Sequence, residues 1–177
     1  MKTLEELKLK LYVVSAGVME VVKESFFILQ TQKEINIPAT TELCMTPEIY
    51  NDKNFIIGFQ EPTIITTNKH MFVSHEKYPE IKKGNNAIVM GDLIEDINMV
   101  KNLELNQIIT VGFYNSQASG KSNEVFKRYV EKFDIVVLND GNLTHVANIL
   151  SHIAGLTPEL QFICSETSTE ASCELPN

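Results

Sequence analysis

Short apolar runs alternate along this chain with longer stretches in which apolar residues recur every three or four positions. The runs at residues 88–90, 108–111 and 135–138 are almost uninterrupted, as in strands covered on both faces. The recurring spacing is typical of helices with one buried face. The pattern predicts strands at residues 9–14, 40–45, 87–90, 107–113 and 134–138, and helices at residues 18–29, 74–83, 93–103, 123–132 and 143–153.

Alternating strands and helices are typical of an α/β fold with a mostly parallel, Rossmann-like sheet. Residues 55–66 are predicted to form a hairpin-like pair around Pro62, although a proline weakens a strand ladder. From residue 157 onward the chain turns to Ser, Thr, Glu and Pro with little periodicity. We therefore expect one domain over residues 1–156 and a disordered tail over residues 157–177.

Composition limits which binding partners and which cellular compartment we expect for this protein. The 177 residues are 44% hydrophobic and 21% charged, which fits one globular domain. The net charge of -8 comes without any basic run, so a nucleic-acid polymer is not an expected partner. No apolar run reaches the ~20 residues that span a bilayer, so no membrane is expected. Three cysteines without C-x-x-C spacing and an acidic N-terminal segment predict a cytoplasmic protein.

The most informative polar residues follow the apolar run at residues 88–90. That run ends in Gly91 and Asp92, and a second acid, Asp96, follows four positions later. Gly91 can open a tight turn, which places Asp92 at the carboxyl end of a strand, where open α/β sheets bind their ligands. Asp96, one helical turn further on, can return to the same crevice. Two carboxylates there suit a divalent cation and a phosphate ester.

Two further residues extend this chemistry, and each has a plainer interpretation. Ser15 ends an apolar run before a helix, so its hydroxyl and the free amides of the helix can hold a phosphoryl oxygen. Lys69 can neutralise phosphate charge. Taken alone, Ser15 also suits a helix N-cap, Lys69 a solvated surface, and Asp92 a turn. Asp96 also suits the first turn of a helix, where an acid complements the dipole.

Five short motifs follow one another in a fixed order along the chain. They are Val-Ser-Ala-Gly at 14–17, Asn-Lys-His at 68–70, Gly-Asp-x-x-x-Asp-Ile-x-Met at 91–99, Val-Gly-Phe-Tyr-Asn at 111–115 and Phe-Asp-Ile-Val-Val at 133–137. In this order they resemble the C-terminal half of the cytosolic 5'-nucleotidase III (pyrimidine 5'-nucleotidase) family, one of the haloacid-dehalogenase-like phosphohydrolases. The resemblance covers residues 9–153. It implies a haloacid-dehalogenase-like core that hydrolyses nucleoside (pyrimidine) 5'-monophosphates through an aspartyl-phosphate intermediate, with magnesium (Mg2+).

The resemblance also implies roles for the residues that would meet the phosphate. Ser15, with the backbone of Ala16 and Gly17, would hold the phosphoryl group. Lys69 would offset charge on the nucleophile and on the phosphate, as a catalytic as well as a phosphate-binding residue. These residues would therefore bind a nucleoside monophosphate substrate through its phosphate.

On the metal side, the resemblance implies that Asp92 ligates Mg2+ directly. Asp96, counted as catalytic, would orient the metal's waters or Lys69. The family usually has a small Ser and Gly between these acids, whereas this chain has Leu-Ile-Glu at residues 93–95. The fine geometry of the metal site is therefore expected to differ from that of the family.

The family's first motif, D-x-D-x-T/V, has no counterpart in this sequence. No aspartate precedes Asp52, no D-x-D occurs anywhere, and only 14 residues precede Ser15. That motif supplies the nucleophile, so we expect the chain to be inactive alone. The missing strand and cap would leave a gap between the strands carrying Ser15 and Asp92, to be covered by a missing N-terminal half or a partner.

Three origins fit this departure: a truncated gene product, half of a split enzyme, or a degenerate paralogue. Loss of the nucleophile also leaves open a second class of function. A chain that kept the sheet and lost the chemistry would be a non-catalytic interaction or ligand-binding module. Phosphate release, tested with an Asp92→Asn control, distinguishes this module from a 5'-nucleotidase.

Overall fold

The computed structural model describes residue 4 and residues 6–32, 37–74, 76–115, 123–139, 141 and 143–155. The chain divides into two compact units, Met1–Leu143 and Thr144–Asn177. The first unit carries every candidate site residue. In the second unit the structure describes one helix, α4 (Thr144–Ile153), with Val146 buried. The expected tail over residues 157–177 lies outside the described residues.

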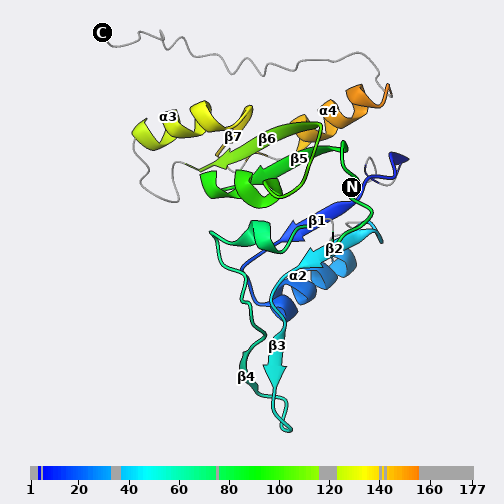
Figure 1. Ribbon diagram of the computed structural model, residues 1–177, viewed down its shortest axis with the longest axis vertical. Helices are drawn as coiled ribbons and strands as arrows, with labels where there is room; N and C mark the ends of the chain where they lie inside the picture. The colour runs from blue at the N-terminus through cyan, green and yellow to red at the C-terminus, as the bar shows by residue number, and fades with distance from the viewer. Residues whose placement is uncertain are drawn as a thin grey trace. The chain divides into compact units, whose positions relative to one another are not determined.

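Strands and helices follow one another in the first unit as shown in Figure 1. The helical elements are α2 (Met19–Gln32), α3 (Asn123–Lys132), and the 3-10 helices η1 (Lys69–Met71) and η2 (Ile94–Val100). The strands are β1 (Leu11–Val14), β2 (Thr41–Cys44), β3 (Glu48–Tyr50), β4 (Ile56–Phe59), β5 (Asn86–Gly91), β6 (Gln107–Tyr114) and β7 (Ile135–Leu138). None of the described helices is long and apolar enough to cross a membrane.

Two of the three sheets formed by the described strands are parallel, which confirms an α/β fold. β5, β6 and β7 form one parallel sheet with β6 in the middle, and β1 pairs with β2 in a second (Figure 1). β3 and β4 form a separate antiparallel hairpin. Among the described strands, β1 pairs only with β2, and β5 only with β6. The edges of the parallel sheets that these described strands form are therefore β1 and β2 in one sheet and β5 and β7 in the other.

The three-stranded sheet is packed by aromatic side chains. Tyr114 on β6 contacts Tyr129 of α3 edge to face, with ring centroids 5.2 Å apart, and Tyr129 lies 5.4 Å from Phe133. A Cβ atom at Gly112 would collide with the Phe133 ring, so only glycine lets α3 and its following turn approach β6 this closely. Aromatic burial of this kind stabilises the sheet strongly.

A second core joins the two-stranded sheet to the loop before β5. Cys44 at the end of β2 packs with Val73, Tyr78 and Leu103. The Cys44 thiol lies 2.8 Å from the Tyr78 hydroxyl, and the Tyr12 ring on β1 contacts Tyr78 edge to face. Side chains of segment 72–81, among them Val73 and Tyr78, thus pack against β1 and β2 without hydrogen-bonding to either strand as a further strand of the sheet.

Several predicted elements are confirmed, and three are wrong. The helix at residues 123–132 has the predicted bounds, and the strand predicted at residues 107–113 is β6. The hairpin predicted over residues 55–66 is instead made by β3 and β4, which places Pro62 beyond the ladder it would have interrupted. The described residues of 74–83 form turns, and the α-helix predicted over residues 93–103 is the shorter η2.

Candidate functional site

Ser15 stands at the carboxyl end of β1 in a tight turn. Its N–H donates a hydrogen bond to the Cys44 carbonyl over 3.1 Å, and its hydroxyl oxygen accepts one from the Gly17 N–H over 3.0 Å. These bonds fix the turn against β2 and orient the side chain. The hydroxyl hydrogen is left to donate, since a serine hydroxyl both accepts and donates.

The helix after this turn is capped by a residue that no sequence pattern indicates. Glu48, the first residue of β3, accepts a hydrogen bond from the Glu20 N–H over 3.0 Å, and the whole residue is only 8% exposed. One of the unpaired amides in the first turn of α2 is thus satisfied by a carboxylate 28 residues away. No local pattern could have revealed this contact, because it depends on how the hairpin packs against α2.

Lys69 and Asp96 form a buried ion pair. The Lys69 ammonium lies 2.6 Å from one Asp96 carboxylate oxygen, and the two side chains are 14% and 2% exposed. The other carboxylate oxygen accepts a hydrogen bond from the Leu93 N–H over 3.2 Å. Asp96 therefore holds the start of η2 and the position of Lys69 at the same time.

Gly91 makes the position of Asp96 possible. A Cβ atom added to Gly91 would overlap the Cβ and carboxylate atoms of Asp96. The Asp96 side chain thus packs directly on the main chain where β5 ends. This contact explains why glycine and aspartate stand five positions apart in this motif.

Asp92 differs from Asp96 in both exposure and partners. Its residue is exposed, and its carboxylate makes no hydrogen bond or ion pair with the residues that the structure describes. Its main-chain carbonyl accepts a hydrogen bond from the hydroxyl of Tyr129, a residue only 2% exposed. The backbone of Asp92 is therefore anchored by α3 while its carboxylate faces solvent. Tyr129 was not expected from the sequence, since an aromatic residue in a helix signals only a buried face.

The structure brings some of the candidates together and leaves others apart. Lys69 contacts Asp96, and Asp92 follows directly after β5. Ser15 belongs to the other parallel sheet, and among the described residues no hydrogen bond or ion pair joins it to Lys69 or Asp92. Ala16 is exposed in the Ser15 turn.

The chain between the two halves of the candidate site is held by side-chain hydrogen bonds. The Thr46 hydroxyl, just after β2, accepts from the Ile64 N–H over 2.7 Å. The Asn68 side chain accepts from the Ile65 N–H over 2.7 Å and donates to the Thr63 carbonyl over 2.9 Å, immediately before Lys69. The position of Lys69 thus depends on the segment that begins at β2.

The described residues match only part of a magnesium site. Mg2+ in proteins is commonly bound by one or two carboxylates, with waters and substrate phosphates filling the remaining positions. Asp92 offers one unpaired carboxylate, whereas both Asp96 oxygens already have partners. In the described part of the chain, no three His, Cys, Asp or Glu side chains gather as a metal cluster. Asp92 fits as one ligand, and the described residues do not complete the set.

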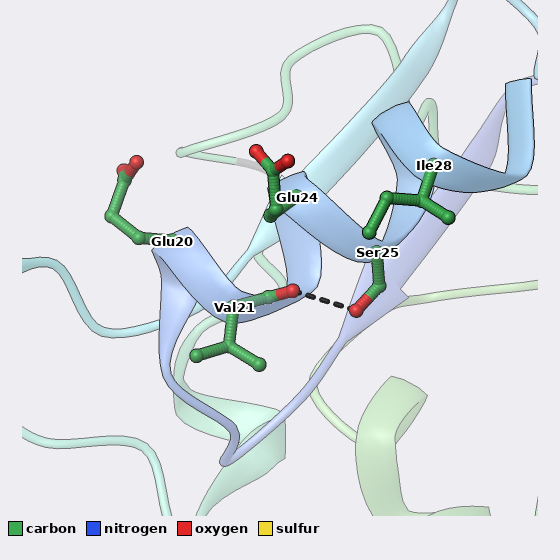
Figure 2. Close-up of a pocket in the computed structure, with 5 residues that line it drawn as sticks. All are labelled: Glu20, Val21, Glu24, Ser25 and Ile28. Atoms are coloured by element: carbon green, nitrogen blue, oxygen red, sulfur yellow. Dashed lines mark hydrogen bonds between the residues drawn. The ribbon is translucent and has the colours of Figure 1, made fainter. Parts of the chain in front are cut away.

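A surface hollow elsewhere on the chain does not coincide with these residues. It runs along one face of α2, with Glu20, Val21, Glu24, Ser25 and Ile28 around it (Figure 2). The Ser25 hydroxyl turns back to the Val21 carbonyl, 2.7 Å away, so it is engaged within its own helix. We attach no chemistry to this hollow.

Comparison with known proteins gives a consistent family. The family described as "Pyrimidine 5'-nucleotidase (UMPH-1)" matches residues 1–154. The 7-methylguanosine phosphate-specific 5'-nucleotidase A of Xenopus laevis is 27% identical over 154 residues, which cover 85% of this chain and 50% of that protein. The 7-methylguanosine phosphate-specific 5'-nucleotidase of Homo sapiens is 27% identical over 164 residues, covering 90% and 52%. This chain spans about half the length of the curated relatives it matches.

Proposed function

This chain belongs to the pyrimidine 5'-nucleotidase (UMPH-1) family, and from that premise we propose that it forms the phosphate-binding and metal-facing part of an enzyme hydrolysing nucleoside 5'-monophosphates. The observation that carries the proposal is the Lys69–Asp96 ion pair packed against Gly91, next to the exposed carboxylate of Asp92. A fixed ammonium, tied through Asp96 to the strand end that also carries Asp92, suits an anionic ligand with a bound cation.

Each proposed role uses donors that the chain leaves available. The Lys69 ammonium has three N–H groups and gives one to Asp96, so two can reach phosphate oxygens. Ser15 would donate its hydroxyl hydrogen to the phosphate, supported by the main chain of Ala16, while the Gly17 N–H stays bonded to the Ser15 hydroxyl and orients it. Asp96 acts as a positioning residue, because it touches Lys69 rather than the substrate.

Magnesium enters the proposal through Asp92 alone. Its carboxylate would be one ligand, and the phosphate, waters and residues beyond those described would supply the others. When bound there, the ion would neutralise charge on the phosphoryl oxygens.

None of the residues assigned above supplies the nucleophile that would attack the phosphate. With no D-x-D in the 177 residues, we propose that the chain alone binds nucleotide without turning it over. We further propose that a parallel strand from the rest of the family's polypeptide pairs between β1 and β5, whose edges are unpaired among the described strands. Such a strand would deliver a carboxylate between Ser15 and Asp92.

The base preference is proposed from the family rather than from any contact. A pyrimidine monophosphate is the first choice, since the matching family is described as pyrimidine 5'-nucleotidase. 7-Methylguanosine monophosphate is the second, because the relatives are named for that substrate. Both share the 5'-phosphate that the proposed residues would bind.

The test is nucleotide binding by the chain with magnesium present. Cytidine, uridine and 7-methylguanosine monophosphates are titrated into the wild type by calorimetry, and Ser15→Ala and Asp92→Asn are compared with Asp52→Asn. Asp52 is exposed in the β3–β4 turn, so that control removes the same charge away from the proposed site. We expect at least one nucleotide to bind and to raise the melting temperature, with both site variants weaker by about tenfold or more.

Three results would contradict the proposal. Ser15→Ala and Asp92→Asn variants that bind like the wild type would remove these residues from the site. Phosphate release that depends on Asp92 would show that the chain already holds an attacking group. Failure of every nucleotide to bind would favour a non-catalytic interaction module.

A further inference from the structure

Glu48 is an acid beside a proposed phosphate site, and the inference drawn from it rests on the proposed function. It begins β3, and its carboxylate accepts the N–H of Glu20, the second residue of α2. Only two residues separate Glu20 from Gly17, the last residue of the Ser15 turn. The carboxylate therefore lies within about one helical turn of the atoms proposed to hold phosphate.

The contact places a negative charge where a phosphate would also be attracted. The first amides of a helix and its dipole favour an anion at the N-terminus. At 8% exposure Glu48 is screened little by solvent, and it already takes one of these amides. The Glu48 carboxylate thus partly neutralises the positive, N-terminal end of the α2 dipole.

The hairpin holds Glu48 firmly in this position. Pro47, the preceding residue, accepts a hydrogen bond from the Gln60 N–H over 2.9 Å. One residue earlier, the Thr46 hydroxyl accepts from the Ile64 N–H over 2.7 Å, and Thr46 is itself buried. The carboxylate is therefore a fixed charge beside α2 rather than a mobile surface acid.

We propose that the Glu48 carboxylate lowers the affinity of the Ser15 turn for phosphate and keeps the phosphate away from the N-terminal end of α2. A phosphate held at the Ser15 turn would feel the like charge of Glu48, because only about one helical turn, a rise of about 5 Å, separates the two along α2. Through a medium intermediate between protein and water, that repulsion changes the affinity for a dianion by about tenfold. The affinity of the site is thus set below what the helix end alone would give.

The experiment measures inorganic phosphate binding by amide chemical shifts of residues 15–20. Wild type is compared with Glu48→Gln, whose side-chain carbonyl can still accept the Glu20 N–H while the charge is gone. Glu24→Gln is the matched control, since Glu24 is exposed one turn further along α2. We expect Glu48→Gln to bind phosphate about tenfold more tightly, the control to bind within twofold of wild type, and the difference to shrink as salt is raised.

If Glu48 had a purely structural role, Glu48→Gln would bind phosphate equally or more weakly than wild type. Tighter binding by this variant therefore distinguishes the proposed role from a structural one. If Glu48→Gln binds no tighter than wild type while Ser15→Ala still weakens binding, the role of Glu48 is overturned and the proposed function stands. If phosphate binds to neither wild type nor Glu48→Gln, both the role of Glu48 and the proposed function are contradicted. Should Glu48→Gln lose helical circular dichroism, Glu48→Met, of similar size and uncharged, replaces it under the same criteria.

Discussion

The two parallel sheets of this chain differ in how completely they are packed. On the three-stranded sheet α3 packs Tyr129 between Tyr114 and Phe133, while Val130 of α3 and Leu138 of β7 stay exposed. On the side of the two-stranded sheet, α2 is longer than α3 but has no buried residue, and its Val21, Phe27 and Ile28 are exposed. The β3–β4 hairpin likewise exposes Ile49, Tyr50, Ile56, Ile57 and Phe59.

The residues of the candidate site therefore lie in surroundings of different stability. Asp92 and Asp96 follow β5 of the three-stranded sheet, where the ion pair with Lys69 fixes Asp96 and the Tyr129 hydroxyl holds the main chain of Asp92. Ser15 belongs to the sheet with two strands, and sheets this small are only marginally stable by themselves. We therefore expect the region of Asp92 and Asp96 to be preorganised and the Ser15 turn to depend on whatever completes its sheet.

The largest expected effect comes from breaking the buried ion pair. Asp96→Ala removes the carboxylate partner of Lys69, whose side chain is only 14% exposed in the pair, and should lower the free energy of unfolding by about 3–5 kcal/mol. Urea denaturation followed by circular dichroism measures the change. Asp52→Ala, on an exposed turn, should change stability by less than about 0.5 kcal/mol. A small loss in Asp96→Ala would mean that the three-stranded side is not held by this pair.

The same substitution in the two regions tests the contrast directly. Phe133→Ala removes a side chain that is 5% exposed and should cost about 3–4 kcal/mol. Phe27→Ala removes one that is 58% exposed and should cost less than about 1 kcal/mol. Thermal or urea unfolding of both variants gives the comparison. Equal losses would show that α2 is packed as tightly as α3, and the proposed difference between the sheets would be wrong.

The smallest effect concerns acid stability of the two-stranded side. The Lys10 ammonium, a main-chain hydrogen bond and the Tyr12 hydroxyl lower the pKa of Glu80 from 4.5 to about 2. Because the folded pKa is below the unfolded one, this carboxylate stabilises the fold above pH 4.5, and its contribution fades as pH falls toward 2. Glu80→Gln should therefore be less stable than wild type at pH 6, with the gap closing as pH falls toward 2.

Urea midpoints measured across that pH range provide the readout. Glu104→Gln, which removes an ion pair between two exposed side chains, should show a smaller gap at every pH. A gap in Glu80→Gln that did not depend on pH would assign its effect to packing instead of charge.

The apolar pattern predicts an element well where the buried positions form one continuous run, as in β6, or lie on one helical face, as in α3. β6 and α3 are of this kind, and their positions follow from the spacing of apolar residues alone. η2 was expected as an α-helix because Ile94, Ile97 and Val100 are suitably spaced. It forms a 3-10 helix whose first turn is tied to Asp96.

What the sequence could not predict depends on contacts between distant segments. β3 has three residues after a proline, too few for an alternation to be recognised. The hydrogen bonds of Glu48 to Glu20 and of Tyr129 to Asp92 join residues 28 and 37 positions apart. Motif order selected Lys69 and Asp96, but their pairing at 2.6 Å is a property of the folded chain. The division into two parallel sheets likewise depends on strand pairing, about which apolar runs carry no information.

The close packing of Asp96 on Gly91 means that these two positions cannot evolve independently. Any side chain at position 91 would displace the carboxylate, and a shorter residue at position 96 would leave a void over the glycine. Substitutions at the two sites should therefore be strongly non-additive, and related sequences should keep or exchange the two residues together. Covariation between these two columns, more than the presence of either residue, would identify chains that share this strand end.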